Sequence, residues 1–478
     1  MVGYGDQALN AYRLMVAGLA VVVLVMIVGF TLLYSALSSL RGEVSSISRS
    51  LEDQARLVGE LQRQISAQAE TLRGLEELRA RVESVERALG GVASARDLER
   101  LAEELGRVSA QLRILEGSVG AVNESLRSSL RDLLGRVEAL TERVNVLAEQ
   151  MLFPVTVVDG VGDKVVILRK PSRIVSLAPS VTETLYYIGA LEALVAVDPW
   201  SDFPQSVRER RERGELATVD YWSPSAEAIA ALKPDLVIGV ASVPSHRALK
   251  SLLSQYGIPV LLLPDFKLSD VVDSLLIAGR ATGRIVEAYE AVYKVELAIK
   301  YASLLASKAE LKPRIAAVVW VKPLFVVGGG TWEHDMLELV GYNVYGDLSL
   351  WPQVSPESML ERAPEVIVMT SSYGMVGVED LVNTLLETLG DAAYKIPALR
   401  DGRIYVLTGD YENAFVRPSP RTIIAIYVLL AALHPHLFDL SPAEIPRALS
   451  PETLDIIRIL ERIAPDPVVE VVRKGLKG

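Results

Sequence analysis

The chain has 478 residues, of which 50% are hydrophobic and 23% are charged, and its formal net charge is −11. This length predicts two or more domains, and the negative charge argues against nucleic acid or an anionic lipid surface as the main partner. The absence of cysteine from the sequence excludes disulfides, thiolate metal ligands, a cysteine nucleophile and a lipidated cysteine anchor.

The first feature along the chain is an uncharged stretch over residues 14–40, rich in Val, Leu, Ile and Met. About 20 apolar residues are enough for a helix to cross a bilayer. The alternative is a cleaved signal peptide, whose apolar core is usually only about 7–15 residues long behind a clearly basic start. Here Asp6 and Arg13 precede a longer core, which favours an uncleaved anchor. We therefore expect a short tail over 1–13 and a transmembrane helix over 14–38.

The next segment, 40–151, repeats apolar residues at alternating steps of four and three, beginning with Leu40, Val44 and Ile47. Glu, Arg and Gln fill the positions between them, and no proline interrupts the pattern. This spacing is typical of an α-helical coiled coil, here predicted as a stalk. A coiled coil needs a partner helix. Either chains associate into a homo-oligomer through this segment, or the segment folds back at the Gly-Gly pair 90–91.

The periodicity changes after residue 154, where short buried-strand patterns alternate with helical patterns. The stretch VTVVDGVGDKVVIL predicts a hairpin, and the strand patterns RIVSLAP, LVAV, DLVIGV and PVLLLP follow it. The alternation predicts two parallel-sheet α/β lobes joined by a long helix. The expected bounds are 155–266 for the first lobe, 269–310 for the helix, 313–440 for the second lobe and 441–478 for a helical tail.

One segment occurs twice, once in each predicted lobe. YWSPSAEAIAALKPDLVIG matches SLWPQVSPESMLERAPEVIVM when the Pro-Asp pair of the first is placed on the Pro-Glu pair of the second. Glu227 then falls on Glu357. Trp222 falls within one residue of Trp351, with Tyr221 as the alternative at that place.

Loops that we expect at the carboxyl ends of the strands carry aromatic side chains. Ligands of open α/β sheets bind outside those ends, and binding sites favour domain interfaces. Aromatic faces suit a large, flat, partly apolar ligand, although a single loop aromatic can merely cover the core of its lobe. As a group, these side chains predict a ligand-binding cleft, and they are Trp200, Tyr221, Trp222, Phe325 and Trp351.

Several motifs, in this order, resemble those of the substrate-binding proteins of ABC importers: RIVSLAPSVTETLYYIGA, DPWSDFP, PLFVVGGGTWEHDMLELVGY, WPQVSPESML and VRPSPRTI. The resemblance covers roughly residues 155–440 and is to the rigid-hinge class that binds cobalamin and iron–siderophore complexes. The cobalamin-binding members are the most similar in pattern. The resemblance implies that the corrin ring would be surrounded by Trp200, Trp222, Phe325 and Trp351.

The same resemblance implies a partner for the two glutamates. Glu227 and Glu357, one in each lobe, match positions that dock onto arginines of the two permease subunits. A pseudo-twofold pair of carboxylates suits a symmetric basic partner. A plainer role is compensation of the helix N-terminal charge, worth about 0.3–1 kcal/mol, and both roles can hold together. A siderophore would need a cation for its anionic groups, and Arg417 is the candidate.

Other chemistry finds little support in the sequence. The triple glycine at 328–330 lacks the GK[ST] ending of a phosphate-binding loop, and there is no GxSxG nucleophile motif. Of four histidines, His334 lies nearest the predicted cleft, whereas a zinc site typically needs three or four ligands. His246, at an expected helix start, is predicted to be exposed. We therefore expect no enzyme activity and no resident metal or cofactor.

Together, these patterns predict a membrane-tethered extracellular protein with its amino terminus inside the cell. It would deliver a cobalamin-like or iron–siderophore chelate to an ABC importer, with heme less favoured, and would need permease and ATPase subunits as partners. The alternative is a coiled-coil oligomeric surface receptor or scaffold, whose ligand-binding head is not coupled to transport. The short segment 1–13 argues against a cytoplasmic signalling output.

Overall fold

The structure, a computed structural model, describes residues 74–89, 94–118, 124–371 and 377–477. The predicted transmembrane helix over 14–38 and the part of the predicted coiled coil that precedes residue 74 lie outside these ranges. None of the helices within the described ranges is both long and apolar enough to span a bilayer.

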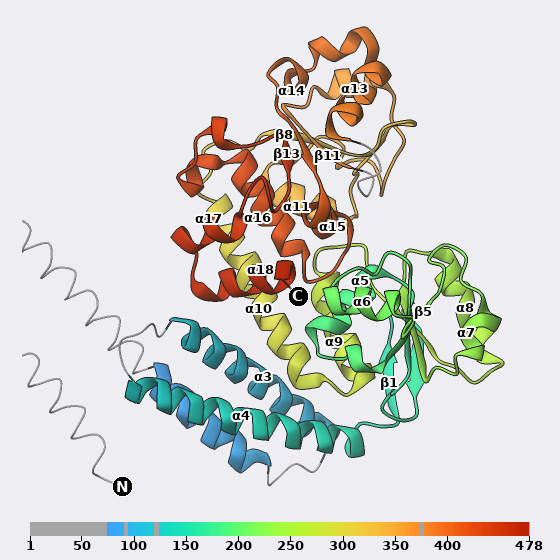
Figure 1. Cartoon of the computed structure of the whole chain (residues 1–478), viewed down its shortest axis with the longest axis vertical. Coiled ribbons are helices and arrows are strands. Elements are labelled where there is room, and N and C mark those ends of the chain that lie inside the picture. The colour runs from blue at the N-terminus through green and yellow to red at the C-terminus, as the bar shows by residue number, and fades with distance from the viewer. Residues whose placement is uncertain (1–73, 90–93, 119–123, 372–376, 478) are drawn as a thin grey trace, which may run out of the picture. The chain divides into compact units, whose positions relative to one another are not determined.

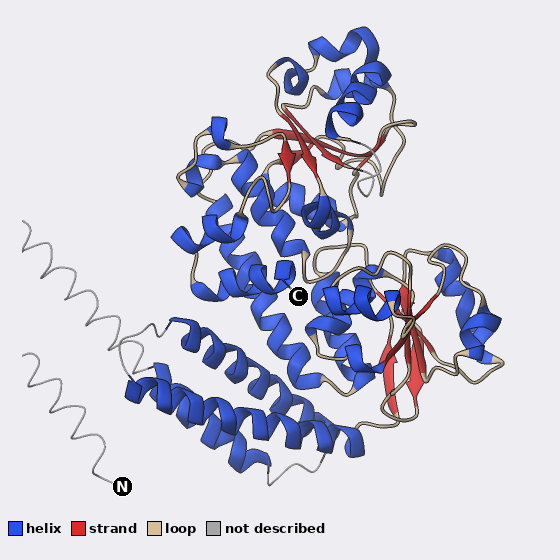
Figure 2. Ribbon diagram, viewed as in Figure 1, coloured by secondary structure: helices blue, strands red, loops and turns tan. Residues whose placement is uncertain are grey.

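The first lobe is built on a five-stranded parallel sheet in the order β5-β4-β3-β6-β7 (Figure 2). Its strands are β3 (Ile174–Ser176), β4 (Leu194–Val197), β5 (Ala217–Thr218), β6 (Leu236–Val240) and β7 (Val260–Leu263). The helical elements of this lobe are α5 (Pro179–Tyr187), η1 (Leu191–Ala193), α6 (Gln205–Glu212), α7 (Ala226–Ala231) and α8 (Pro244–Ser254). The strands β3, β6 and β7 are buried along their whole length, as expected where helices cover both faces of a parallel sheet. The predicted α/β alternation is confirmed.

A hairpin of β1 (Val155–Val158) and β2 (Lys164–Ile167) precedes this sheet, as the sequence predicts. Asp159 shapes its turn, because one carboxylate oxygen accepts hydrogen bonds from the backbone of Val161 and Asp163. Gly160 donates its N–H to the carbonyl of Leu262 in β7. A Cβ at Gly160 would lie 2.5 Å from the nitrogen of Pro264, so this close contact with the sheet edge requires glycine.

The second lobe contains a sheet in the order β10-β8-β11-β12-β13, with parallel pairing throughout that path and β9 antiparallel to β8. Its strands are β8 (Arg314–Trp320), β9 (Phe325–Val326), β10 (Tyr342–Asn343), β11 (Val366–Thr370), β12 (Ile404–Leu407) and β13 (Ala448–Leu449). Its helical elements are α11 (Trp332–Val340), α12 (Pro356–Arg362), α13 (Val378–Leu389), η2 (Gly390–Lys395), α14 (Pro397–Arg400), α15 (Gly409–Val416), α16 (Thr422–Leu433), η3 (Pro435–Phe438) and η4 (Pro442–Glu444).

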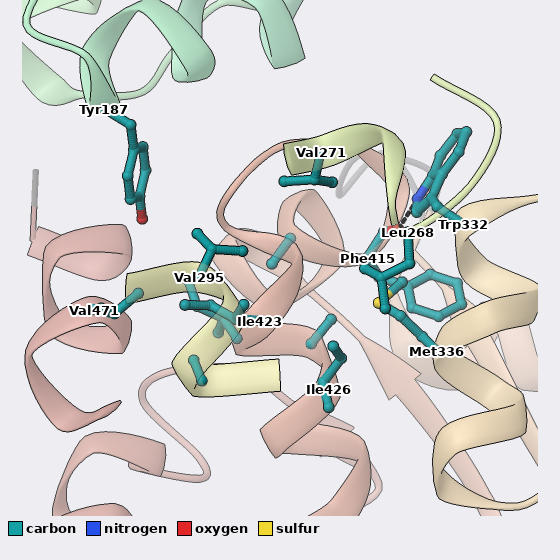
Figure 3. Close-up of a cluster of buried hydrophobic side chains, with 14 of the residues drawn as sticks. Tyr187, Leu268, Val271, Val295, Trp332, Met336, Phe415, Ile423, Ile426 and Val471 are labelled. Atoms are coloured by element: carbon teal, nitrogen blue, oxygen red, sulfur yellow. Dashed lines mark hydrogen bonds between the residues drawn. The ribbon is translucent and has the colours of Figure 1, made fainter. Parts of the chain in front are cut away.

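Two helices join the lobes, α9 (Asp270–Thr282) and α10 (Ile285–Ala306). The sequence shows one helical pattern through this region, and the structure breaks it at Gly283, which adopts the left-handed conformation with φ 72° and ends α9. One apolar cluster spans both lobes and the joining helices (Figure 3). It includes Leu268, Val295 and Ile426.

Three N-terminal helices pack on one another: the helix at 74–89, α3 (Ala95–Ser118) and α4 (Glu124–Met151) (Figure 1). Of these, α3 and α4 also pack on α10. Their shared apolar cluster contains the heptad residues Val82, Val85, Leu101, Leu105, Val108, Val137, Leu140 and Val144. Over residues 74–151, each helix therefore has another helix of the same chain as its partner. This is the fold-back arrangement, one of the two that the heptad pattern left open.

Two C-terminal helices, α17 (Ile456–Ile463) and α18 (Asp466–Lys477), complete the fold. α18 packs against α10 and also contacts α3. Contacts of this kind make Leu75–Gly478 one compact unit.

Candidate ligand-binding site

The duplicated segment folds in the same way in each lobe. The helices α7 and α12 each begin after a serine N-cap, Ser225 or Ser355, whose side chain accepts a hydrogen bond from the backbone N–H three residues on. Each copy then passes through a left-handed residue directly before a proline, Lys233 with φ 49° and Ala363 with φ 45°. The strands β6 and β11 follow. The internal repeat predicted from the sequence is confirmed.

The acidic residue after each proline makes the same kind of hydrogen bond in both copies, to the backbone of the neighbouring strand. Asp235 accepts a hydrogen bond from the backbone N–H of Arg173, at 3.1 Å, and Glu365 accepts one from the N–H of Arg314, at 2.9 Å. These bonds tie the start of β6 to the start of β3, and the start of β11 to the start of β8. The pseudo-twofold relation between the lobes therefore extends to individual hydrogen bonds.

Glu227 and Glu357 occupy equivalent positions, the second residue after the serine cap, and both are exposed. The pKa of each carboxyl is lowered by a hydrogen bond from its own backbone N–H and by one from the cap serine. Both glutamates are therefore ionised at neutral pH and accessible at the surface, one on each lobe.

The aromatic residues of the first lobe follow the carboxyl ends of β4 and β5. Trp200 is 44% exposed and Trp222 is 69% exposed. The ring of Tyr221 packs edge-on against Trp222, with the ring centroids 4.6 Å apart, and against His246, at 5.2 Å. Large apolar faces in these loops are thus open to solvent.

His246 packs beneath Tyr221, on the side of the protein core. The prediction that His246 is exposed is wrong. Its ring is fully buried, with Nδ1 accepting a hydrogen bond from the N–H of Val240 and Nε2 lying 2.9 Å from the carbonyl of Tyr221. Burial lowers the pKa of His246 to about 4, so the ring is neutral and Nε2–H is the donor. Gly239 makes room for it, since a Cβ there would lie 3.0 Å from Nδ1.

The triple glycine determines the position of the loop that carries Trp351 in the second lobe. The N–H groups of Gly328 and Gly329 donate to the carbonyls of Leu350 and Leu348, at 2.7 and 2.6 Å, and a Cβ at Gly328 would lie 2.5 Å from the latter oxygen. Only glycine permits this approach, which draws the Trp351 loop alongside β9.

Phe325 lies in β9, where it pairs with Gln353 of the Trp351 loop. On its other side Phe325 pairs with Trp320 at the carboxyl end of β8, and this indole is 46% exposed. Sequence reasoning missed Trp320, although its position at the end of a predicted strand was the available signal. We add Trp320 to the candidate ligand-binding residues.

A hydrogen bond to a buried carboxyl orients the ring of Trp351. Its Nε1 donates a hydrogen bond to Oε1 of Glu333, at 3.2 Å, and its ring packs edge-on against Trp332. Trp332 is in turn held by a hydrogen bond from its Nε1 to the carbonyl of Phe415, at 2.8 Å (Figure 3). These contacts fix the orientation of the Trp351 ring.

Glu333 is the second residue that sequence reasoning missed. It is 2% exposed, and its Oε2 has no hydrogen-bond partner in the part of the chain that the structure describes. Burial raises the pKa of Glu333 to about 8. The sequence signal was weak, because a glutamate in the first turn of a helix is usually exposed.

Two more buried carboxyls lie at the ends of first-lobe strands. Asp198 follows β4 and Asp265 follows β7, and burial raises the pKa of each to about 6. Asp198 accepts a hydrogen bond from the backbone N–H of Trp200, and Asp265 accepts one from that of Ser242, both at 2.8 Å. Asp198 therefore stiffens the loop that carries Trp200, and Asp265 ties the loop after β7 to the loop after β6.

Arg417 lies in a buried ion-pair network between the lobes. Its side chain is only 5% exposed, and its guanidinium contacts Glu183 of α5 at 3.1 Å and Asp202 at 2.7 Å. Arg421 also contacts Glu183, at 3.0 Å. Burial alone would lower the pKa of Arg417, but the two carboxylates raise it above its ordinary value. Contact between Arg417 and a ligand stays a prediction, and its charge is already balanced within the protein.

Metal ligation finds no support in the described ranges, where no group of three or more His, Asp or Glu side chains could hold an ion. A groove of about 1030 Å³ does exist on the first lobe, lined by residues such as Lys233, Tyr256 and Val260. It lies at the amino ends of β6 and β7, opposite the aromatic loops, so we do not assign the ligand to it.

Comparison with known proteins decides the family. Residues 174–411 match the family model described as periplasmic binding protein. A vitamin B12-binding protein of Vibrio parahaemolyticus is 31% identical over 259 residues, an alignment that covers 53% of this chain and 86% of the relative. The chain belongs to the periplasmic binding protein family.

A further relative and a solved structure agree with this family assignment. The uncharacterised ABC transporter substrate-binding lipoprotein YvrC of Bacillus subtilis is 27% identical over 294 residues, covering 60% of this chain and 88% of that protein. Among solved structures, the molybdate-bound periplasmic binding protein MolA of Haemophilus influenzae has a TM-score of 0.53 at 19% identity. It covers 68% of this chain and 98% of its own, which shows a shared fold. The relatives are solute- or substrate-binding proteins by their printed names, so this chain is a binding protein and not an enzyme.

Proposed function

We propose that this protein binds a cobalamin-like corrinoid outside the cell and delivers it to an ABC importer. The observation that carries the proposal is the set of aromatic faces at the carboxyl ends of strands in both lobes, with Trp351 held in a fixed orientation by Glu333. Such faces suit a large, flat, partly apolar ligand. The printed names of several relatives, which are vitamin B12-binding proteins, point in the same direction.

The charges around these loops favour a corrinoid over an anionic ferric siderophore or heme. Arg417 is the cation that a siderophore would use, and it is already paired with Glu183 and Asp202. The carboxyl of Asp198, at the start of the Trp200 loop, is buried as well. A multiply anionic chelate would have to displace an ion pair or approach this carboxylate, and both cost free energy.

Glu227 and Glu357 form the proposed docking points for the permease subunits. Both are ionised, exposed and related by the internal repeat. Equivalent carboxylates on the two lobes fit two equivalent arginine-bearing subunits. An ATPase subunit would supply the energy for transport.

The tether is also part of the proposal. A membrane helix over 14–38 would hold the binding unit outside the cell, with residues 40–73 of the predicted coiled coil linking that helix to the compact unit that begins at Leu75. The packing of α3 and α4 on α10 supports a direct structural connection between the N-terminal helices and the lobes. Association of chains through residues 40–73 belongs to the proposal as well.

Calorimetric titration of the detergent-solubilised full chain with cyanocobalamin, a ferric hydroxamate siderophore and heme tests the ligand. We expect saturable binding of cyanocobalamin that is lost when Trp200 and Trp351 are both replaced by alanine. Tyr394→Ala is the matched control, because Tyr394 is an exposed aromatic in η2, away from these loops.

Binding of the siderophore or heme alone would overturn the corrinoid assignment and keep the importer function. Binding of none of the three would favour the alternative, a surface receptor or scaffold whose head is not coupled to transport.

A further inference from the structure

The loop that carries Trp200 follows the carboxyl end of β4 and receives contacts from both lobes. Burial alternates along it. Ser201 and Phe203 are buried, whereas Trp200 is 44% exposed and the side chain of Asp202 is 40% exposed. Trp200 and Asp202 therefore both lie on the outer side of the loop.

The first anchor of this loop is Arg211, in the last turn of α6. Its guanidinium donates hydrogen bonds to three backbone carbonyls, those of Pro199 at 2.6 Å, Ser201 at 3.1 Å and Asp198 at 3.4 Å. Hydrogen bonds from a charged donor are stronger than those from a neutral one. Because two of these carbonyls belong to the residues directly before and after Trp200, Arg211 fixes the backbone at Trp200.

The second anchor comes from the other lobe. Arg417, which follows α15, contacts the carboxylate of Asp202 at 2.7 Å. The guanidinium carbon of Arg421 lies 4.0 Å from the ring centroid of Phe203, a cation–π contact. Cations of the second lobe thus hold the two residues at the far end of the Trp200 loop.

Asp202 is the half-exposed end of a buried network. Glu183 of α5 contacts both cations, Arg417 at 3.1 Å and Arg421 at 3.0 Å. Burial alone would raise the pKa of Asp202, but Arg417 lowers it below its ordinary value, so this carboxyl is charged at neutral pH. Without Asp202, Arg417 would keep Glu183 as its partner. Loss of this one carboxylate should therefore free the loop without unfolding the protein.

We propose that Arg211 and Asp202 are positioning residues that orient Trp200 for the ligand, Arg211 from within the first lobe and Asp202 through Arg417 of the second. This inference rests on the proposed function, in which the ring of Trp200 contacts the ligand. A side chain held in its bound orientation loses less freedom on binding, and the affinity is higher for that reason. Since Asp202 takes its position from the second lobe, separation of the lobes would loosen Trp200 and weaken binding.

Fluorine NMR of the full chain, solubilised in detergent and labelled with 5-fluorotryptophan, tests the positioning without any ligand. The sequence has five tryptophans, so Trp200→Phe and Trp351→Phe are sufficient to assign the two signals of interest. We expect Asp202→Asn and Arg211→Met to shift or broaden the Trp200 signal and to leave the Trp351 signal unchanged. The Tm of Asp202→Asn should stay close to that of the wild type.

Calorimetric titration with cyanocobalamin tests the consequence for binding. We expect Asp202→Asn and Arg211→Met each to weaken binding about tenfold, as for the loss of a hydrogen bond to a charged group. Asp202→Glu, which restores a carboxylate opposite Arg417, should recover most of the affinity and the wild-type Trp200 signal.

Two exposed residues provide matched controls. Arg213→Met removes a second arginine at the end of α6, one that pairs with Glu215. Asp401→Asn removes a carboxylate that pairs with Arg400, outside the Trp200 loop. Both controls should keep the wild-type Trp200 signal and the wild-type affinity.

The proposal fails if Asp202→Asn and Arg211→Met give the Trp200 signal of the controls, whatever their affinity. It also fails if the Trp200 signal changes in these variants and cyanocobalamin binds as tightly as to the wild type. A wild type that does not bind cyanocobalamin would overturn the ligand assignment instead, and the Trp200 signal would still show whether the two residues position the ring.

Discussion

The indole Nε1 of Trp351 donates a hydrogen bond to the buried carboxyl of Glu333, at 3.2 Å, and the second carboxyl oxygen has no partner among the described residues. A carboxyl in this setting keeps its proton at neutral pH. Glu333 is thus a positioning residue for the proposed ligand site, and its titration links the stability of the protein to pH.

The titration of Glu333 should lower the free energy of unfolding as pH rises from 6.5 to 8.0, against smaller opposite contributions from His246 and Lys474, whose folded-state pKa values are lowered by burial. Unfolded, Glu333 loses its proton near pH 4.5, whereas in the folded protein it keeps the proton up to about pH 8. Between these values only the folded state binds the proton, so raising the pH destabilises it, by on the order of 2 kcal/mol over this window. Urea unfolding at the two pH values measures this.

Glu333→Gln should remove the fall in stability that Glu333 causes and stabilise the protein at pH 8.0, because glutamine keeps the acceptor for Trp351 without a titrating group. Asp198 and Asp265 titrate near pH 6, below the window. Glu361→Gln, at an exposed position, is the control and should keep the wild-type slope. A wild-type slope in Glu333→Gln would show that another group is responsible.

Gly106 of α3 should be indispensable for the packing of the N-terminal helices. A Cβ there would lie 2.6 Å from the carbonyl oxygen of Val286 and 2.8 Å from the Cβ of Tyr289, both in α10. We expect Gly106→Ala to lower the Tm, although alanine favours a helix by up to about 1 kcal/mol.

The matched control for this substitution is Gly135→Ala in α4, where a Cβ would meet nothing within 4 Å. It should stabilise the protein by up to about 1 kcal/mol, because only the helix propensity changes. Equal effects of the two substitutions would contradict the close packing of α3 on α10.

Glu183 should be the most sensitive member of the ion-pair network between the lobes. Its carboxylate contacts both Arg417 and Arg421, and all three side chains are buried. Glu183→Ala leaves two buried cations with fewer partners, so we expect a loss of about 3–5 kcal/mol in urea unfolding. Glu215→Ala, which breaks a surface ion pair with Arg213, should change stability little. A small effect at Glu183 would mean that water replaces its contacts.

The two lobes should move little when ligand binds. The apolar cluster that includes Val295 of α10 is shared by both lobes, and Glu183 and Arg417 join them on another side. Solution X-ray scattering of the compact unit from Leu75 onward, with and without cyanocobalamin, should give nearly the same radius of gyration. A marked compaction would indicate hinge closure instead.

The sequence by itself determined the features that depend on neighbouring residues. The alternation of strands and helices, the β1–β2 hairpin and the internal repeat follow from local patterns. A serine cap needs only the backbone three residues on, so the equivalence of Glu227 and Glu357 was visible in the sequence.

Only the tertiary structure decided what each exposed or charged side chain meets. The heptad pattern showed an apolar stripe, but the stripe does not specify whether another chain or α10 covers it. The burial of His246, the pairing of Arg417 and the unpartnered oxygen of Glu333 depend on residues from other elements. Burial and ion pairing arise from contacts between segments far apart in the chain. The spacing of residues along the sequence does not predict those contacts.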